Sequence, residues 1–134
     1  MTNEKITQGL LDELTAKAKA SPRLRMNLDL RNSASDQSQR MLNAIEPGSP
    51  MPIHRHRKTS ETVVVLRGKL VWEYYDELER VCTEAIEVSA GGPVYGLNVP
   101  AGQWHTVRAI ESGSVILETK NGAYEPLSDN DILK

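Results

Sequence analysis

Two histidines stand one residue apart in the segment PIHRHRKTSETVVVLRG, which spans residues 52–68. His54 and His56 would share one face of an extended strand, because side chains alternate between the two faces. Glu61 follows a short polar connection that could return its carboxylate to the two imidazoles. The chain has three histidines, and the third, His105, follows the turn-forming sequence PAGQW. Three imidazoles and one carboxylate are a suitable ligand set for a divalent transition metal, with positions left for water or substrate.

Each of these residues also has a simpler interpretation when taken alone. An isolated His-x-His pair is more often a surface or hydrogen-bonded pair than a metal site. Glu61 could be a solvated residue at the start of a strand, and His105 a partly buried histidine bonded to the backbone. It is the joint arrangement of the four side chains that favours metal binding.

The elements that must position these residues begin with a helix. Apolar residues recur every four positions from Ile6 to Ala18, which predicts an amphipathic helix. Thr2 or Asn3 would cap its start, and it would end before Ser21 and the proline that follows.

After the helix, the period of the apolar residues changes to two. In RLRMNLDL, residues 23–30, apolar and polar residues alternate, which predicts a half-buried strand. Further strands are predicted at residues 40–45, 62–66, 70–75, 81–88, 94–99, 105–110 and 115–120. The valines at 63–65 are expected to be buried on both faces. Many short strands at regular spacing indicate a sandwich or barrel.

Length, charge and cysteine content exclude several classes of protein. One hundred and thirty-four residues suit one compact domain, with an N-terminal helix within residues 1–20 packed on a single barrel of residues 21–134. The net charge of −2 gives no electrostatic reason to expect nucleic acid or an anionic membrane as a partner. No apolar run reaches membrane-spanning length. The single cysteine, Cys82, excludes an intramolecular disulfide and fits a reducing compartment, so we expect a soluble cytoplasmic protein.

The two histidine motifs together resemble those of the cupin superfamily. Its first motif, G-x5-H-x-H-x3,4-E-x6-G, matches the segment from Gly48 to Gly68 completely. Its second motif, G-x5-P-x-G-x2-H-x3-N, is matched in its core by PAGQWH, residues 100–105. Val94 replaces the leading glycine and Ala109 the final asparagine, which puts local turn geometry and one hydrogen bond in doubt.

This resemblance implies an all-β fold, a small cupin double-stranded β-helix or jelly-roll barrel, preceded by an N-terminal α-helix. It also implies one divalent transition metal per chain, namely Zn, Fe, Mn or Ni, held by His54, His56, Glu61 and His105. Cupins commonly dimerise, so the resemblance predicts a homodimer.

Four further segments resemble a narrower group, the WbuC family of cupin-fold metalloproteins. They are SPRLRMNLDL, QRMLNAIEPGSPMPIHRH, VPAGQWHTV and NGAYEPLSDND, and the similarity runs from about Ser21 to Asp131. Such proteins are often encoded among genes for O-antigen or other surface polysaccharide synthesis. The resemblance therefore implies a small-molecule ligand derived from a sugar.

Three functions stay open at this level. The first is Lewis-acid chemistry of an isomerase or epimerase type on a sugar-derived metabolite, for which the sequence names no general base. A metal-bound water, or Glu61 after leaving the metal, are the catalytic candidates. The second is Fe(II)-dependent dioxygenase chemistry. The third is a non-catalytic, metal-dependent sugar-binding module.

Four polar residues are candidate contacts for the substrate, on the basis of strand position. They are Arg25, Asn27, Arg40 and Gln103, and Gln103 shares strand parity with His105. For the first three, a solvated outer face is the alternative interpretation.

Overall fold

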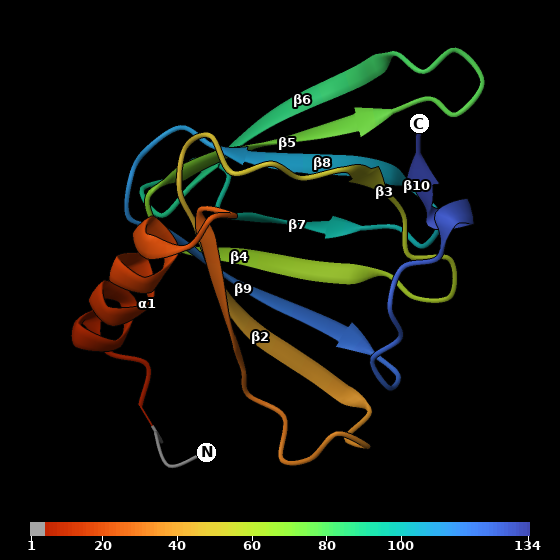
Figure 1. The fold of residues 1–134 in the computed structure, drawn as a ribbon. Helices are drawn as coiled ribbons and strands as arrows, with labels where there is room; N and C mark the ends of the chain where they lie inside the picture. Colours follow the sequence, from red (N-terminus) through yellow and green to blue (C-terminus); the bar gives the residue numbers. More distant parts are fainter. Residues whose placement is uncertain (1–4) are drawn as a thin grey trace.

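The computed structural model describes residues 5–134, which form two five-stranded antiparallel sheets and one α-helix (Figure 1). The first sheet has the strand order β1-β2-β9-β4-β7, and the second has the order β10-β3-β8-β5-β6. The strands are β1 (Arg25–Asp29), β2 (Ser38–Ile45), β3 (Ile53–His54), β4 (Glu61–Arg67), β5 (Lys69–Tyr75), β6 (Cys82–Ser89), β7 (Gly96–Val99), β8 (Trp104–Ala109), β9 (Ser114–Asn121) and β10 (Ile132–Leu133).

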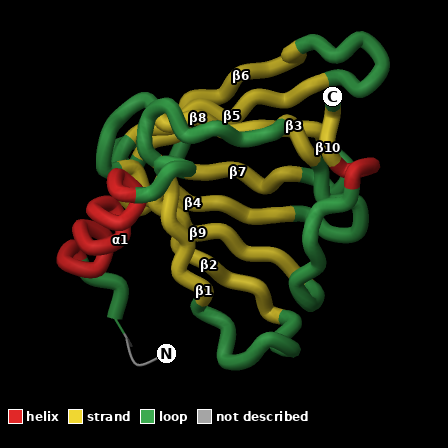
Figure 2. Tube along the Cα trace, viewed as in Figure 1, coloured by secondary structure: helices red, strands yellow, loops and turns green. Residues whose placement is uncertain are grey.

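Each sheet contains neighbouring strands that come from distant parts of the chain, beside one pair of consecutive strands. β9 lies between β2 and β4, and β8 lies between β3 and β5, all in antiparallel register. The chain therefore crosses repeatedly between the two sheets, and its loops join their ends (Figure 2). This topology is the jelly-roll barrel that the sequence predicted.

The main core lies between the two sheets, and strand alternation decides which residues reach it. On β4, Glu61, Val63 and Val65 are buried, whereas Val64 is 42% exposed. The prediction that residues 63–65 are buried on both faces was therefore wrong for Val64. The outer face of β4 is open to solvent at this point, as one face of an antiparallel sheet often is.

Helix α1 (Gln8–Ala20) covers the outer face of the first sheet near β1 and β2. Its Leu10, Leu14 and Ala18 pack in a second apolar cluster with Leu42 and Ala44 of β2. The helix begins later than predicted, because the Oγ1 of its N-cap, Thr7, accepts a hydrogen bond from the Leu10 N–H at 3.2 Å.

The other residues predicted at the start of the helix lie outside it. Ile6 precedes the helix and is 49% exposed. The alternative caps Thr2 and Asn3 lie outside the described residues.

Two short strands were not predicted: β3, which contains His54, and β10, which lies beside it. β3 and β10 have two residues each and pair with one another, so the C-terminal segment is attached beside His54 (Figure 1). Asp131 fixes this segment by accepting hydrogen bonds from the guanidinium Nε of Arg57 at 2.6 Å and of Arg55 at 3.4 Å. α1 lies at the other end of the barrel from this segment (Figure 1). Residues 5–134 contain no helix with the length and apolar character that a membrane crossing requires.

Candidate metal centre

The three histidines converge at one end of the space between the sheets. Each offers a ring nitrogen, and these three atoms lie within 4.8 Å of one another. His54 on β3 pairs directly with His105 on β8, and their ring centroids are 4.4 Å apart. His56 follows β3, and its ring centroid lies 5.2 Å from that of His54 and 5.6 Å from that of His105. Three imidazoles at this spacing could hold a metal ion.

Backbone carbonyls orient two of the three rings. The Nδ1 of His54 lies 2.9 Å from the carbonyl oxygen of Pro52, and the Nδ1 of His105 lies 2.8 Å from that of Gln103. A carbonyl oxygen only accepts, so Nδ1 carries the proton in both rings and Nε2 keeps a free lone pair. This is the usual arrangement for a metal-ligating histidine, whose second nitrogen is held by an acceptor.

Burial keeps two of the imidazoles neutral. Desolvation, followed by the neighbouring His105, lowers the pKa of His54 to about 4. Desolvation also lowers the pKa of His105, which is only 3% exposed. A metal ligand must be deprotonated, so these side chains have a form suited to metal binding at neutral pH.

Glu61 brings a carboxylate to the same place from the first strand residue of β4. It is 4% exposed, and its Oε2 lies 3.2 Å from Nε2 of His56 and 3.8 Å from Nζ of Lys120. Burial alone would raise the pKa of Glu61, but the hydrogen bond with His56 and the charge of Lys120 outweigh it and lower the pKa. Glu61 is therefore ionised beside His56, but it is not one of the three groups whose ligand atoms all lie within 4.8 Å of one another. The imidazole and carboxylate donors fit a divalent transition metal.

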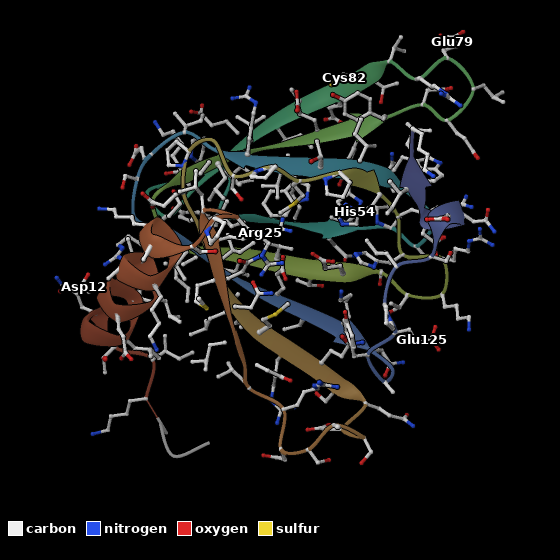
Figure 3. The ribbon with its side chains drawn as sticks, viewed as in Figure 1. Asp12, Arg25, His54, Glu79, Cys82 and Glu125 are labelled. Atoms are coloured by element: carbon white, nitrogen blue, oxygen red, sulfur yellow. The ribbon has the colours of Figure 1, made fainter. Side chains whose placement is uncertain are left out.

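A cavity of about 220 Å³ opens from this centre into the barrel. Its walls come from β1, β2, β4 and β9 of one sheet, from β3, β5 and β8 of the other, and from the C-terminal segment. Tyr124, Glu125 and Leu127 of that segment belong to the lining, so it covers part of the cavity. Figure 3 labels Arg25 on β1 and His54 on β3, two lining residues that come from opposite sheets.

Of the four predicted substrate contacts, two line this cavity and two do not. Arg25 and Asn27 belong to the lining. Arg40 alternates with Met41 and Asn43 on β2, so it lies on the opposite face. There its guanidinium donates a 2.7 Å hydrogen bond to the Ser38 carbonyl and pairs with Asp36.

Gln103 points elsewhere, although it shares parity with His105. Its side-chain amide donates a hydrogen bond of 2.9 Å to the carbonyl of Trp104, its own neighbour in sequence. Because Gln103 precedes β8, strand alternation does not govern its direction.

Sequence reasoning missed several polar residues of the cavity, of which Glu118 has the strongest chemical character. It lies on β9 and lines the cavity together with Lys120. Burial, and then the charge of Glu61, raise the pKa of Glu118 to about 8. A signal was present, because alternation along 114–121 places Glu118 and Lys120 on the same face as the core residue Ile116.

Solved structures similar to this chain are cupin-fold proteins. An oxalate oxidase in complex with the substrate analogue glycolate matches with a TM-score of 0.64 and 16% identity, over 80% of this chain and 55% of that chain. The capsular polysaccharide assembling protein CapF from Staphylococcus aureus matches with a TM-score of 0.62 and 22% identity, over 79% of this chain and 30% of that chain. The cupin domain of Cnp3 from Schizosaccharomyces pombe matches with a TM-score of 0.56 and 13% identity, over 75% of this chain and 65% of that chain.

These similarities establish the cupin fold. This chain spans about half of the length of the oxalate oxidase and about a third of that of CapF. No curated protein matches the sequence significantly. A family model described as a domain of unknown function, DUF6016, matches residues 6–86, and the chain belongs to that family.

Proposed function

We propose that this chain is a metal-dependent cupin protein that binds or transforms a sugar-derived metabolite. The metal would be one divalent transition ion held by His54, His56, Glu61 and His105. The observation that carries this proposal is the convergence of three histidine ring nitrogens within 4.8 Å in the wall of the cavity. The two Nδ1 hydrogen bonds add support, because they leave Nε2 free to bind a metal.

A divalent ion in this position supplies electrostatic stabilisation for negative charge on a substrate carbonyl or hydroxyl oxygen. The protein's own part is then to move protons. Glu118 is the carboxyl group that suits this role, since it lines the cavity and is not needed as a ligand. Burial raises the pKa of Glu118, which favours a protonated carboxyl group that can donate a proton and take one back. A divalent ion and a carboxyl group that exchanges protons together favour an isomerase or epimerase type of reaction.

The link to sugar chemistry rests on resemblance. The segments similar to the WbuC family imply a role in O-antigen or other surface polysaccharide synthesis, and CapF, a fold relative, is described as a capsular polysaccharide assembling protein. Membership of a WbuC-type group, a cytoplasmic location and a homodimer stay predictions that accompany this proposal.

Metal analysis of untagged protein, purified without added metal and under anaerobic conditions, tests the proposal. We expect about one divalent ion per chain, and its loss from the His54→Ala, His56→Ala double variant. Arg108→Ala, whose exposed side chain lies outside the cavity lining, is the matched control and should keep the metal. Circular dichroism would check that all three proteins are folded.

The identity of the ion also decides between two kinds of chemistry. Zinc, manganese or nickel would support Lewis-acid chemistry or binding, whereas iron would favour the Fe(II) dioxygenase alternative. Wild-type protein that is folded and still empty after incubation with each of these ions would refute the proposal.

A further inference from the structure

Two buried polar atoms in the cavity wall have no hydrogen-bond partner among the described residues. They are Oδ1 of Asn43 on β2 and Nε1 of Trp72 on β5, whose residues are 5% and 1% exposed. Both residues line the cavity, and they come from opposite sheets. One atom is an acceptor and the other a donor. Buried polar groups without a partner are rare because each carries a desolvation cost, so this pair indicates a ligand that both accepts and donates hydrogen bonds. A hydroxyl group does both.

The β1 side of the cavity carries positive charge that no carboxylate among residues 5–134 neutralises directly. Arg25 is half-buried and lines the cavity with Arg23, and neither forms an ion pair with any residue from 5 to 134. Desolvation, and then the charge of Arg23, lower the pKa of Arg25, and Glu118 offsets this only in part. A desolvated guanidinium without a partner is costly, and a carboxylate that it can grip with two hydrogen bonds would relieve that cost.

The charge of the whole lining points the same way. It contains three cationic side chains, Arg23, Arg25 and Lys120, and three acidic ones, Glu61, Glu118 and Glu125. Lys120 and Glu61 lie close to one another at the metal centre. The three positive and three negative side chains offset one another, so a bound divalent ion would leave the cavity clearly positive. An anionic ligand with a single charge suits such a site.

We propose that the cavity binds a small hydroxycarboxylate of the sugar-acid type, an inference that rests on the function proposed above. The carboxylate lies at Arg25, and hydroxyl groups reach Asn43 Oδ1, Trp72 Nε1 and the histidine centre. The substrate class is therefore an acidic sugar derivative, and a neutral sugar is a poor ligand.

Calorimetric titration of the metal-loaded protein with D-gluconate and with D-glucitol tests this inference. The two probes have the same six-carbon chain of hydroxyl groups. Gluconate ends in a carboxylate, and glucitol has a neutral alcohol in its place. We expect gluconate to bind at least about tenfold more tightly, the ratio that one charge-assisted hydrogen bond provides. Arg25→Gln should remove most of this preference. Trp72→Phe, which keeps a ring but lacks the N–H, should weaken both probes.

Arg108→Gln is the matched control, because Arg108 lies on β8 outside the cavity lining and its side chain is 58% exposed. It should leave both affinities unchanged. Metal content and thermal unfolding, measured on every sample, keep loss of binding distinct from loss of metal or of fold.

Several outcomes would overturn the inference. It would be refuted by equal affinity for gluconate and glucitol, or by no binding of gluconate. It would also be refuted by tighter binding of glucose 6-phosphate, or by a folded Arg25→Gln variant that still prefers gluconate. All of these would leave the metal proposal intact, provided that the wild type holds its ion. A folded wild type that holds no ion and still prefers gluconate through Arg25 would refute the metal proposal and support this inference.

Discussion

His54 and His105 face one another directly across β3 and β8, with ring centroids 4.4 Å apart. β3 is only two residues long, so this single pair of residues sets the distance between two of the candidate ligands. The carbonyls of Pro52 and Gln103, each two residues before its histidine, fix both rings by the same kind of hydrogen bond. The centre is thus built from two equivalent local hydrogen bonds on either side of one strand pairing.

The lowered pKa of His54 predicts that metal-free protein loses stability in mild acid. The native pKa of about 4 lies below the ordinary value of 6.5, so the unfolded state binds more protons between these two values. The stabilising effect is complete above pH 6.5 and is lost as the pH falls towards 4. It amounts to about 3 kcal/mol for this one group. Urea unfolding at several pH values in this window measures it.

A variant isolates this effect from the carboxylates that titrate nearby. His54→Gln has no imidazole, so its free energy of unfolding should fall less between pH 6.5 and 4.5 than that of the wild type. Equal slopes for the two proteins would contradict the assignment.

Glu118 predicts the opposite dependence on pH. Its native pKa of about 8 exceeds the ordinary value of 4.5, so its favourable contribution is complete below pH 4.5 and is lost as the pH rises through 8. Gln is nearly isosteric and never ionises. Metal-free Glu118→Gln should therefore become more stable relative to the wild type as the pH rises from 5 to 9, as chemical denaturation would show. A stability difference that does not change with pH would contradict the raised pKa.

The two cupin motifs contain glycines that should respond very differently to alanine. Gly68 and Gly102 have similar positive φ angles, +89° and +82°. A Cβ at Gly68 would lie 2.7 Å from the backbone Cα of Ser114, whereas nothing lies within 4 Å of one at Gly102. Gly102→Ala should cost about 1–2 kcal/mol, the penalty for left-handed backbone. Gly68→Ala should cost more than about 3 kcal/mol or prevent folding, because the backbone must also move. Similar unfolding midpoints in urea would show that packing against Ser114 is not decisive.

The C-terminal segment should be loosened by removing one carboxylate. Asp131 accepts hydrogen bonds from Arg57 and from the Ser128 hydroxyl, and its backbone pairs with Arg55 at 3.0 Å. Asp131→Asn should speed amide hydrogen exchange across residues 122–134 and leave β4 and β9 protected. Asp129→Asn, in the same segment but without an ion pair in the described chain, is the control and should change little.

The sequence predicted the parts of this fold that alternation can encode. Most strands were placed to within two residues, and the fold class was confirmed, because period-two patterns and turn residues are local signals. β3 and β10 were not predicted, because a strand of two residues is too short to show an alternation of apolar and polar residues. The start of α1 was misplaced because Ile6 continues the helical spacing while Thr7 supplies the cap.

The candidate site was harder to predict than the fold. Motif spacing located the four candidate ligands. The cavity wall depends on which face of each strand turns inward, and that is a property of the assembled sheets. Arg25 and Arg40 are both polar residues on strands, yet only Arg25 lies on the inner face. Asn43 and Trp72 have polar atoms without a hydrogen-bond partner in the described part of the chain, which only the packed structure reveals.

The position of β3 between β8 and β10 has a thermodynamic consequence. His54 pairs with His105 on one side and with Ile132 on the other. If docking of β10 raises the affinity for the metal by some factor, the metal must favour docking by that same factor, since such linkage is reciprocal. The segment that carries β10 also lines the cavity through Tyr124 and Leu127. With such linkage, binding of the metal and docking of the segment over the cavity would increase or decrease together.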